Sequence, residues 1–171
     1  MMTGPGTPID ALDLDLIAAL NAHPRAGVLE LSRLLGVARG TVQAHLQRLH
    51  DGGIITGYGP DVDLRAAGYP VQAFVTLEIA QGALDEVAAE LDPVSGVIEA
   101  YATAGAGDVL CRVGAHSHED LQQTLLQVNR SPHIVRSTSV VVLSVVVPYR
   151  VLPLLSADRR PSPKRAPTYR R

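Results

Sequence analysis

The sequence predicts an α+β protein in two parts, an N-terminal three-helix (winged) helix-turn-helix domain followed by a ferredoxin-like β-α-β-β-α-β domain. Apolar residues recur at helical spacing over residues 10 to 51, whereas residues 71 to 147 alternate short β-branched runs with amphipathic stretches. The pattern changes between Pro60 and Pro70. A chain of 171 residues is long enough to form two small cores.

The first half predicts three short helices. The first begins near Asp10, where Asp13 favours the positive end of the helix dipole. The second covers about 28 to 35, and Gly36 stands where a helix end needs a positive φ. The third covers about 39 to 51, and a tight glycine turn before it is typical of a helix-turn-helix. The apolar positions expected to face inward are Leu12, Leu16, Ile17, Leu20, Leu31, Leu34, Leu35, Val42, Leu46 and Leu49.

The second half predicts four strands and two helices in ferredoxin-like order. We expect strands at 71–79, 97–103, 109–115 and 134–147, and helices at 84–91 and 119–129. In this fold both helices cover one face of an antiparallel sheet, so the other face needs a partner. Phe74 falls on that second face, where it is suited to an interface.

These patterns divide the chain into four segments. Residues 1–60 form the helix-turn-helix domain, with the motif itself at about 31–50, and residues 61–70 form a hinge. Residues 71–148 form the sensing and oligomerisation domain. We expect the basic, Pro- and Arg-rich tail 149–171 to be disordered, because its composition buries too little apolar surface to fold.

The charge distribution works against strong DNA binding by one subunit. The net charge is −2, but residues 156–171 carry +5, which leaves −7 on the remainder. Residues 1–60 hold four arginines and five acids, so few phosphates would be neutralised per subunit. Any affinity for nucleic acid then depends on a local patch and on the avidity of an oligomer.

Other features predict a cytoplasmic protein without membrane partner or cofactor. The N-terminus lacks the basic start and apolar stretch of a signal peptide, and the apolar run 140–147 is too short to span a bilayer, so we expect a buried strand there. The single cysteine, Cys111, cannot form an intrachain disulfide, and its apolar neighbours predict an inert core thiol.

Four motifs occur in a fixed order along residues 10 to 148. They are Leu12-Asp13-x-x-x-Ile17, Leu31-x-x-Leu34-Leu35-Gly36-Val37, Leu49-x-x-Gly52-Gly53-Ile54-Ile55-x-Gly57-Tyr58 and Gly105-x-x-Asp108. Together they resemble the Lrp/AsnC family of transcriptional regulators. The resemblance implies a non-enzymatic, sequence-specific regulator that binds double-stranded DNA and responds to a small-molecule effector, an amino acid. It also implies a homodimer joined through the sheets, often assembled into tetramers or octamers, with effector bound between subunits.

The third helix supplies the candidate DNA-binding residues. Arg39 and Gln43 are suited to base edges, and Thr41, His45 and Arg48 to phosphates. The candidates are Arg39, Gly40, Thr41, Gln43, Ala44, His45 and Arg48. The family usually has Ser at the position of Ala38 and Arg at that of His45, and an imidazole is mostly neutral at pH 7. A merely solvated polar helix face is the alternative.

The turn Gly105-Ala106-Gly107-Asp108 joins two predicted strands, and glycine with aspartate accounts for it as a plain turn. In the family the matching turn lines the effector cleft, with backbone amides for a carboxylate and Asp for an ammonium group. The family often has a bulky aromatic at the position of Gly107, so we expect a roomier or less defined pocket here. The candidate ligand-binding residues are Tyr101, Thr103, Gly105, Ala106, Gly107, Asp108 and Thr138, of which the two threonines and the tyrosine equally suit ordinary sheet surface.

The segment His116-Ser117-His118-Glu119-Asp120 suggests a metal site, but adjacent side chains diverge, and Ser117 followed by Asp120 is typical of a helix start. We therefore expect no metal site and no catalytic residues. Two alternatives to a regulator remain open: an enzyme subunit of the siroheme-decarboxylase type built from the same two domains, or a sensing and co-assembly module without DNA readout.

Overall fold

The computed structural model describes residues 9–157. The chain divides into two compact units. The helical unit comprises Met1–Pro60 with Pro148–Arg171, and the sheet unit comprises Asp61–Val147. No helix among residues 9–157 has the length and apolarity needed to cross a membrane.

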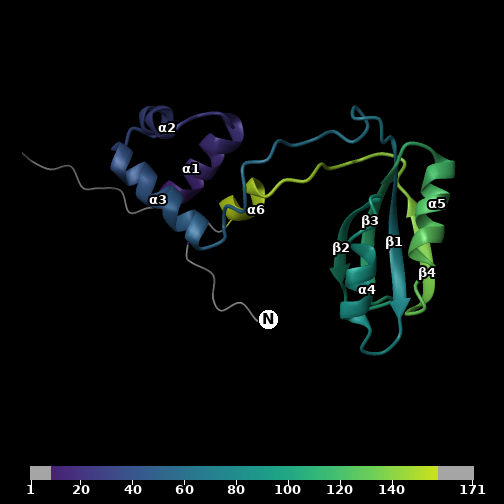
Figure 1. The fold of residues 1–171 in the computed structure, drawn as a ribbon. Helices are drawn as coiled ribbons and strands as arrows, with labels where there is room; N and C mark the ends of the chain where they lie inside the picture. The colour runs from purple at the N-terminus through teal and green to yellow at the C-terminus, as the bar shows by residue number, and fades with distance from the viewer. Residues whose placement is uncertain (1–8, 158–171) are drawn as a thin grey trace, which may run out of the picture. The chain divides into compact units, whose positions relative to one another are not determined.

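The helical unit contains α1 (Ala11–Ala22), α2 (Val28–Leu35) and α3 (Arg39–Asp51), as Figure 1 shows. Gly36 ends α2 with a φ of 65°, which confirms the predicted glycine turn before α3. The buried core of the unit is Leu16, Leu31, Val42 and Leu49.

One residue predicted to face the core does not do so: the Leu34 side chain is 49% exposed. A helix of eight residues buries one narrow face, here centred on Leu31 and Leu35, and Leu34 lies at its margin.

The tail also differs from the expectation, because Leu152–Ala157 form a short helix, α6, that contacts α1. This stretch is apolar, with half-buried Leu152 and Leu155, and the arginine-rich part begins only after it. Pro153 lies in the first turn of α6, where a backbone N–H is not needed. The rest of the expected disordered tail, 158–171, lies outside the described residues.

The sheet unit has the predicted ferredoxin-like order. Its elements are β1 (Val71–Ile79), α4 (Leu84–Leu91), β2 (Val97–Ala102), β3 (Val109–Ala115), α5 (His118–Val128) and β4 (Ile134–Val141). The strands pair antiparallel in the order β2-β3-β1-β4, with α4 and α5 on one face of the sheet (Figure 1). Side chains of β1 and β3 at alternate positions, such as Val75 and Cys111, are buried beneath these helices.

Neither helix of the sheet unit, residues 61–147, lies on the second face of the sheet (Figure 1), and we call it the open face. Phe74 on β1 pairs with Arg112 on β3 and with Val140 on β4, which places all three on the open face. Phe74 is 42% exposed and Val140 is 64% exposed, although both are large and apolar. The predicted position of Phe74 on an uncovered face is therefore confirmed.

The last strand ends six residues earlier than expected. β4 stops at Val141 because its partner β1 begins at Val71: the pairing reaches Ala73 opposite Val141, and the Val142 N–H donates to the Gln72 carbonyl at 2.8 Å. Beyond this point β1 offers no further residue for pairing, and Leu143 is 91% exposed. The buried strand expected at 140–147 was wrong: only Val140 and Val141 belong to a strand, and both are exposed.

Candidate DNA-binding and effector-binding sites

Helix α3 presents five of the seven candidate DNA-binding residues to solvent. It begins directly after the glycine turn, with Ala38 as an N-cap whose side chain makes no capping bond. Its exposed candidates are Arg39, Gly40, Thr41, Gln43 and Ala44. These positions follow from the burial of Val42 and Leu49, which fix the rotation of the helix against the core.

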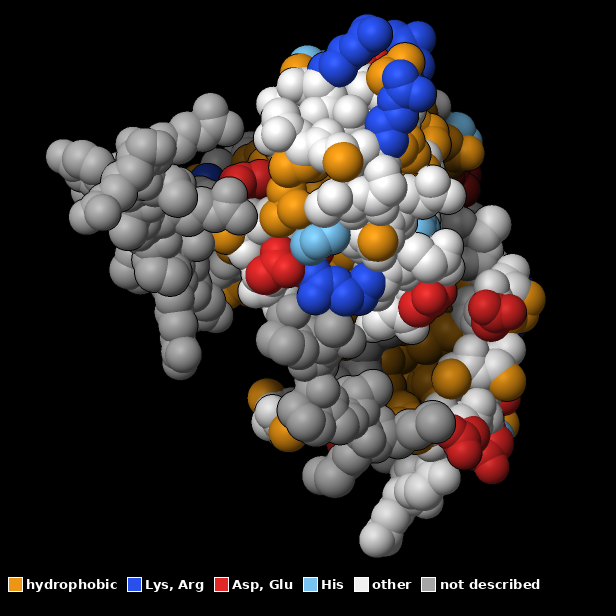
Figure 2. Space-filling view, turned by 90° about the vertical axis from the view of Figure 1, so that its left-hand side faces the viewer, with side chains coloured by type: hydrophobic (Ala, Val, Ile, Leu, Met, Phe, Trp, Pro, Cys, Tyr) orange, Lys and Arg blue, Asp and Glu red, His pale blue; other side chains and the backbone are white. Residues whose placement is uncertain are grey.

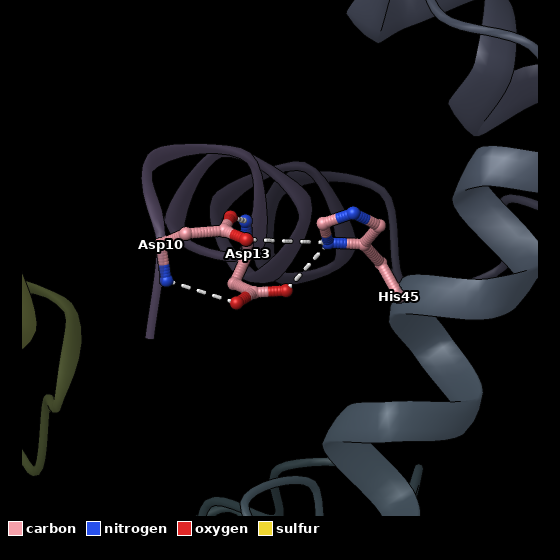
Figure 3. Close-up of side chains that lie close together, drawn as sticks. All are labelled: Asp10, Asp13 and His45. Carbon is pink, nitrogen blue, oxygen red and sulfur yellow. Dashed lines mark hydrogen bonds and ion pairs between the residues drawn. The ribbon is translucent and has the colours of Figure 1, made fainter. Parts of the chain in front are cut away.

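The other two candidates, His45 and Arg48, are turned toward the start of α1. His45 Nδ1 lies 2.8 Å from Asp13 Oδ1, and Arg48 Nη2 lies 2.8 Å from Asp10 Oδ2. Arg48 Nη2 also donates to Asp13 Oδ2. Figure 3 shows both acids at the start of α1 directed toward the imidazole of α3. We call Asp10, Asp13, His45 and Arg48 the interhelical cluster.

The acids of this cluster also cap α1. The Asp13 N–H donates to Asp10 Oδ1 and the Asp10 N–H donates to Asp13 Oδ2, both at 2.9 Å. This reciprocal pair is a capping box. Asp13 is 1% exposed, so its charge is stabilised by these bonds rather than by water.

The cluster perturbs two ionisable groups in opposite directions. Burial alone would raise the pKa of Asp10, but the bond from the Asp13 N–H and the nearby Arg48 guanidinium outweigh it and lower that pKa. Hydrogen bonds to Asp13 and Asp10 raise the pKa of Arg48. Figure 2 shows a face where basic side chains gather at the top, while a second basic group lower down touches acidic and histidine side chains.

Sequence reasoning missed the burial of Asp13 and its pairing with α3. The spacing of Asp10 and Asp13 was a signal for a capping box, but the partners on α3 lie 32 and 35 residues away in the chain. Only packing of α1 on α3 brings them together.

The cluster does not fit a metal ion. One ligand atom each from Asp10, Asp13 and His45 lie within 4.8 Å of one another. However, the Arg48 guanidinium already lies against both carboxylates and supplies their counter-charge. A cation would have to displace it, so the arrangement is that of a salt-bridge network.

The turn at 105–108 has a defined geometry. Gly105 has a φ of 149°, the Asp108 N–H donates to the Leu77 carbonyl at 2.9 Å, and Asp108 Oδ2 accepts from the Ile79 N–H at 2.8 Å. Among the described residues, the amides of Gly105, Ala106 and Gly107 donate to no backbone carbonyl. Asp108 is therefore bonded to β1, and of the three unbonded N–H groups those of the exposed residues Gly105 and Ala106 are left for other partners.

Within this chain Gly107 leaves no extra space beside the turn. Gly107 is buried, and a Cβ there would collide with Thr76 Cγ2 and lie 3.3 Å from the Leu77 carbonyl oxygen. The bond from Asp108 to Leu77 holds this part of the turn against β1, so the Thr76 side chain fills the space. Thr76 is a neighbour of the turn that sequence reasoning did not identify.

The remaining ligand candidates do not converge within one chain. Across the open face, Tyr101 pairs with Leu110, Leu110 with Thr76, and Thr76 with Thr138. Tyr101 and Thr138 are thus three strand spacings apart, roughly 14 Å. Thr103 instead closes the turn, its hydroxyl donating to the Gly107 carbonyl at 2.7 Å.

Two further motifs have structural roles. The His116 N–H donates to Asp120 Oδ2, and the Asp120 N–H donates to Ser117 Oγ, which is the start of α5. His116 also stacks on Tyr69 with ring centroids 3.9 Å apart. Burial raises the pKa of the Cys111 thiol to about 11, so the reactive thiolate is scarce at neutral pH.

Comparison with known proteins matches both units. Residues 9–56 match the winged helix-turn-helix DNA-binding model, and residues 72–152 match the Lrp/AsnC ligand binding domain. The regulatory protein AsnC of Escherichia coli K12 is 31% identical over 137 residues, which cover 79% of this chain and 90% of AsnC.

Solved structures agree. The structure of E. coli AsnC has a TM-score of 0.79 and 27% identity, covering 86% of this chain and 100% of that chain. A feast or famine regulatory protein of M. tuberculosis, complexed with L-methionine, has a TM-score of 0.75 and 26% identity, covering 84% and 98%.

A helix-turn-helix joined to a ligand-binding domain of this topology defines a DNA-binding transcriptional regulator that responds to a small molecule. The chain belongs to the Lrp/AsnC family. The predicted family, fold class and regulatory function are confirmed, and the relatives named above are regulatory proteins.

Proposed function

We propose that this regulator acts as a homodimer, or a higher assembly of dimers, that binds double-stranded DNA through α3 and is controlled by an amino acid bound beside the turn 105–108. It performs no catalytic step. The observation that carries the effector assignment is the pair of unbonded, exposed amides of Gly105 and Ala106 near Asp108. Amides of this kind bind a carboxylate, and an aspartate binds an ammonium group, so the turn suits both charged ends of an amino acid.

The open face supports the dimer. Phe74, Ile98 and Val140 are each more than a third exposed there, and apolar area of this kind is normally covered. A second copy lying on this face would bring the Thr138 region of one protomer toward the turn of the other. The separation of Tyr101 and Thr138 within one chain then poses no difficulty, because a site between subunits draws on both copies. The M. tuberculosis relative complexed with L-methionine supports an amino-acid effector.

The exposed residues of α3 support the DNA contact. Arg39 and Gln43 carry the hydrogen-bonding groups suited to base edges, and Thr41 a hydroxyl suited to phosphate. One helical unit offers few free cations, since Arg48 is already paired with two acids. Binding by several units at once supplies the affinity that one unit lacks.

Fluorescence anisotropy with DNA from the region upstream of the protein's own coding sequence tests the regulator. We expect tighter binding to it than to random DNA of equal length at the same salt concentration, and light scattering should report a dimer or a multiple of it. Equal affinity for both DNAs would contradict sequence-specific binding.

Thermal shifts with a panel of free amino acids test the effector site. Asp108→Asn keeps an oxygen to accept from the Ile79 N–H but removes the charge. We expect the amino acid that stabilises the parent to leave this variant unshifted, while the exposed control Asp85→Asn on α4 keeps the shift. A full shift in Asp108→Asn would remove Asp108 from the site.

A further inference from the structure

The hydrogen bond between α1 and α3 determines which nitrogen of His45 carries its proton. Asp13 Oδ1, which lies 2.8 Å from Nδ1, belongs to a carboxylate and can only accept. Nδ1 must therefore be the donor. Arg48 Nη2 lies 3.2 Å from the same nitrogen. Both groups, the Nδ1–H of His45 and the guanidinium of Arg48, donate hydrogen bonds to the carboxylates of α1. In the neutral ring, the proton is thus on Nδ1 and the lone pair on Nε2.

Nε2 faces a different environment. Figure 3 shows it turned away from both carboxylates, and the His45 side chain is 21% exposed. His45 also lies on α3 beside the exposed residue Ala44. With a lone pair, Nε2 cannot donate to a phosphate oxygen. After protonation it donates a charge-assisted hydrogen bond.

The charges around His45 determine whether its protonation favours or opposes contact with a DNA phosphate. Carboxylates of Asp10 and Asp13 face it from the start of α1, and the guanidinium of Arg48 faces it from α3 itself. From α2, which also packs on α3, no ion pair to His45 is present among the described residues. With a neutral imidazole the cluster carries one net negative charge, which repels phosphate, and protonation of His45 removes it.

We propose that DNA binding by this chain takes up a proton at His45, so that affinity rises as the pH falls through the range in which imidazoles titrate. The inference rests on the proposed DNA contact through α3. Asp13 acts as a positioning residue, because it holds Nδ1 and leaves Nε2 for the phosphate. Uptake of one proton per contact makes the affinity change by up to about tenfold per pH unit.

Fluorescence anisotropy of the full chain with its upstream DNA tests this, at constant ionic strength between pH 5.5 and 8.5. We expect the parent to bind more tightly at low pH. His45→Gln should bind with an affinity nearly independent of pH. His45→Arg, permanently charged, should also be independent of pH and should match or exceed the parent at pH 8.5. His50→Gln, an exposed histidine on the same helix that contacts Tyr58, should keep the parental slope.

The outcomes separate the two proposals. Sequence-specific binding that does not vary with pH, or a slope that survives in His45→Gln, overturns the proton linkage and leaves the regulator intact. Absence of specific binding at every pH overturns both. Should His45→Gln fail to fold, an NMR titration of the parent decides: DNA must raise the pH at which His45 is half protonated, and an unchanged midpoint would refute the proposal.

Discussion

The helical unit and the sheet unit place their ion pairs in opposite environments. In the helical unit, Asp13 is 1% exposed and pairs with two side chains of α3. On the open face of the sheet unit, Glu78 and Arg136 lie 3.7 Å apart with side chains 43% and 70% exposed. The ion pairs of Asp13 join α1 to α3 in a buried position, whereas the pair of Glu78 and Arg136 lies on the surface of the sheet.

Buried ion pairs stabilise the fold, whereas exposed ion pairs leave their charged side chains available to a partner. A buried carboxylate that accepts several hydrogen bonds stabilises the contact between α1 and α3, but it also pairs with Arg48, which is then no longer a free cation. Exposed pairs contribute little and remain available to a partner. The DNA-binding unit thus uses part of its small positive charge to hold its own recognition helix.

Removing the buried acid should have the largest effect. Asp13→Ala deletes the partner of His45 and Arg48 and half of the capping box, so we expect the helical unit to lose about 3 kcal/mol of stability. Hydrogen exchange of α1 and α3 amides in the full chain measures this locally. Glu78→Ala is the matched control on the open face and should cost less than about 0.5 kcal/mol. Equal losses in the two variants would contradict the comparison.

A loss of stability of intermediate size should follow from a substitution in the sheet unit, where the turn 105–108 packs on β1. A methyl group at Gly107 would collide with Thr76 Cγ2, so Gly107→Ala should cost about 2 kcal/mol. Thr76→Ser removes that Cγ2 and keeps the hydroxyl. The double variant should regain much of the loss in chemical denaturation. Additive effects of the two substitutions would show that Gly107 is not packed against Thr76.

The elements with local signals could be predicted from the sequence. Periodic apolar residues and the glycine turn locate α2 and α3 over the residues expected, and alternation along residues 71 to 79 assigns Val75 to the core and Phe74 to the open face. These signals act within a few residues of the chain.

Apart from Leu34, which lies at the margin of its own helix face, the errors concern contacts between distant segments. Asp13 is buried because α3 supplies its partners, and β4 ends at Val141 because β1 begins opposite. Gly107 has no room because Thr76 lies beside it. The candidate sites share this dependence: the exposed residues of α3 follow from periodicity, but the engagement of His45 and Arg48 by α1 requires the packed structure.

The smallest expected effect concerns Asp10, the exposed member of the interhelical cluster. Asp10→Ala removes the N-cap of α1 and should cost about 1 kcal/mol, whereas Asp10→Asn keeps a capping oxygen and loses only the charge. Since the cluster lowers the pKa of Asp10 from 3.8, the charge stabilises the folded state fully above that value, and this stabilisation is lost as the pH falls through the lower folded value. Asp10→Asn should therefore be less stable than the parent at pH 7 and approach it in acid. Denaturant unfolding at a series of pH values measures the difference, and a gap that stayed constant into acid would show that the charge of Asp10 does not stabilise the contact between α1 and α3.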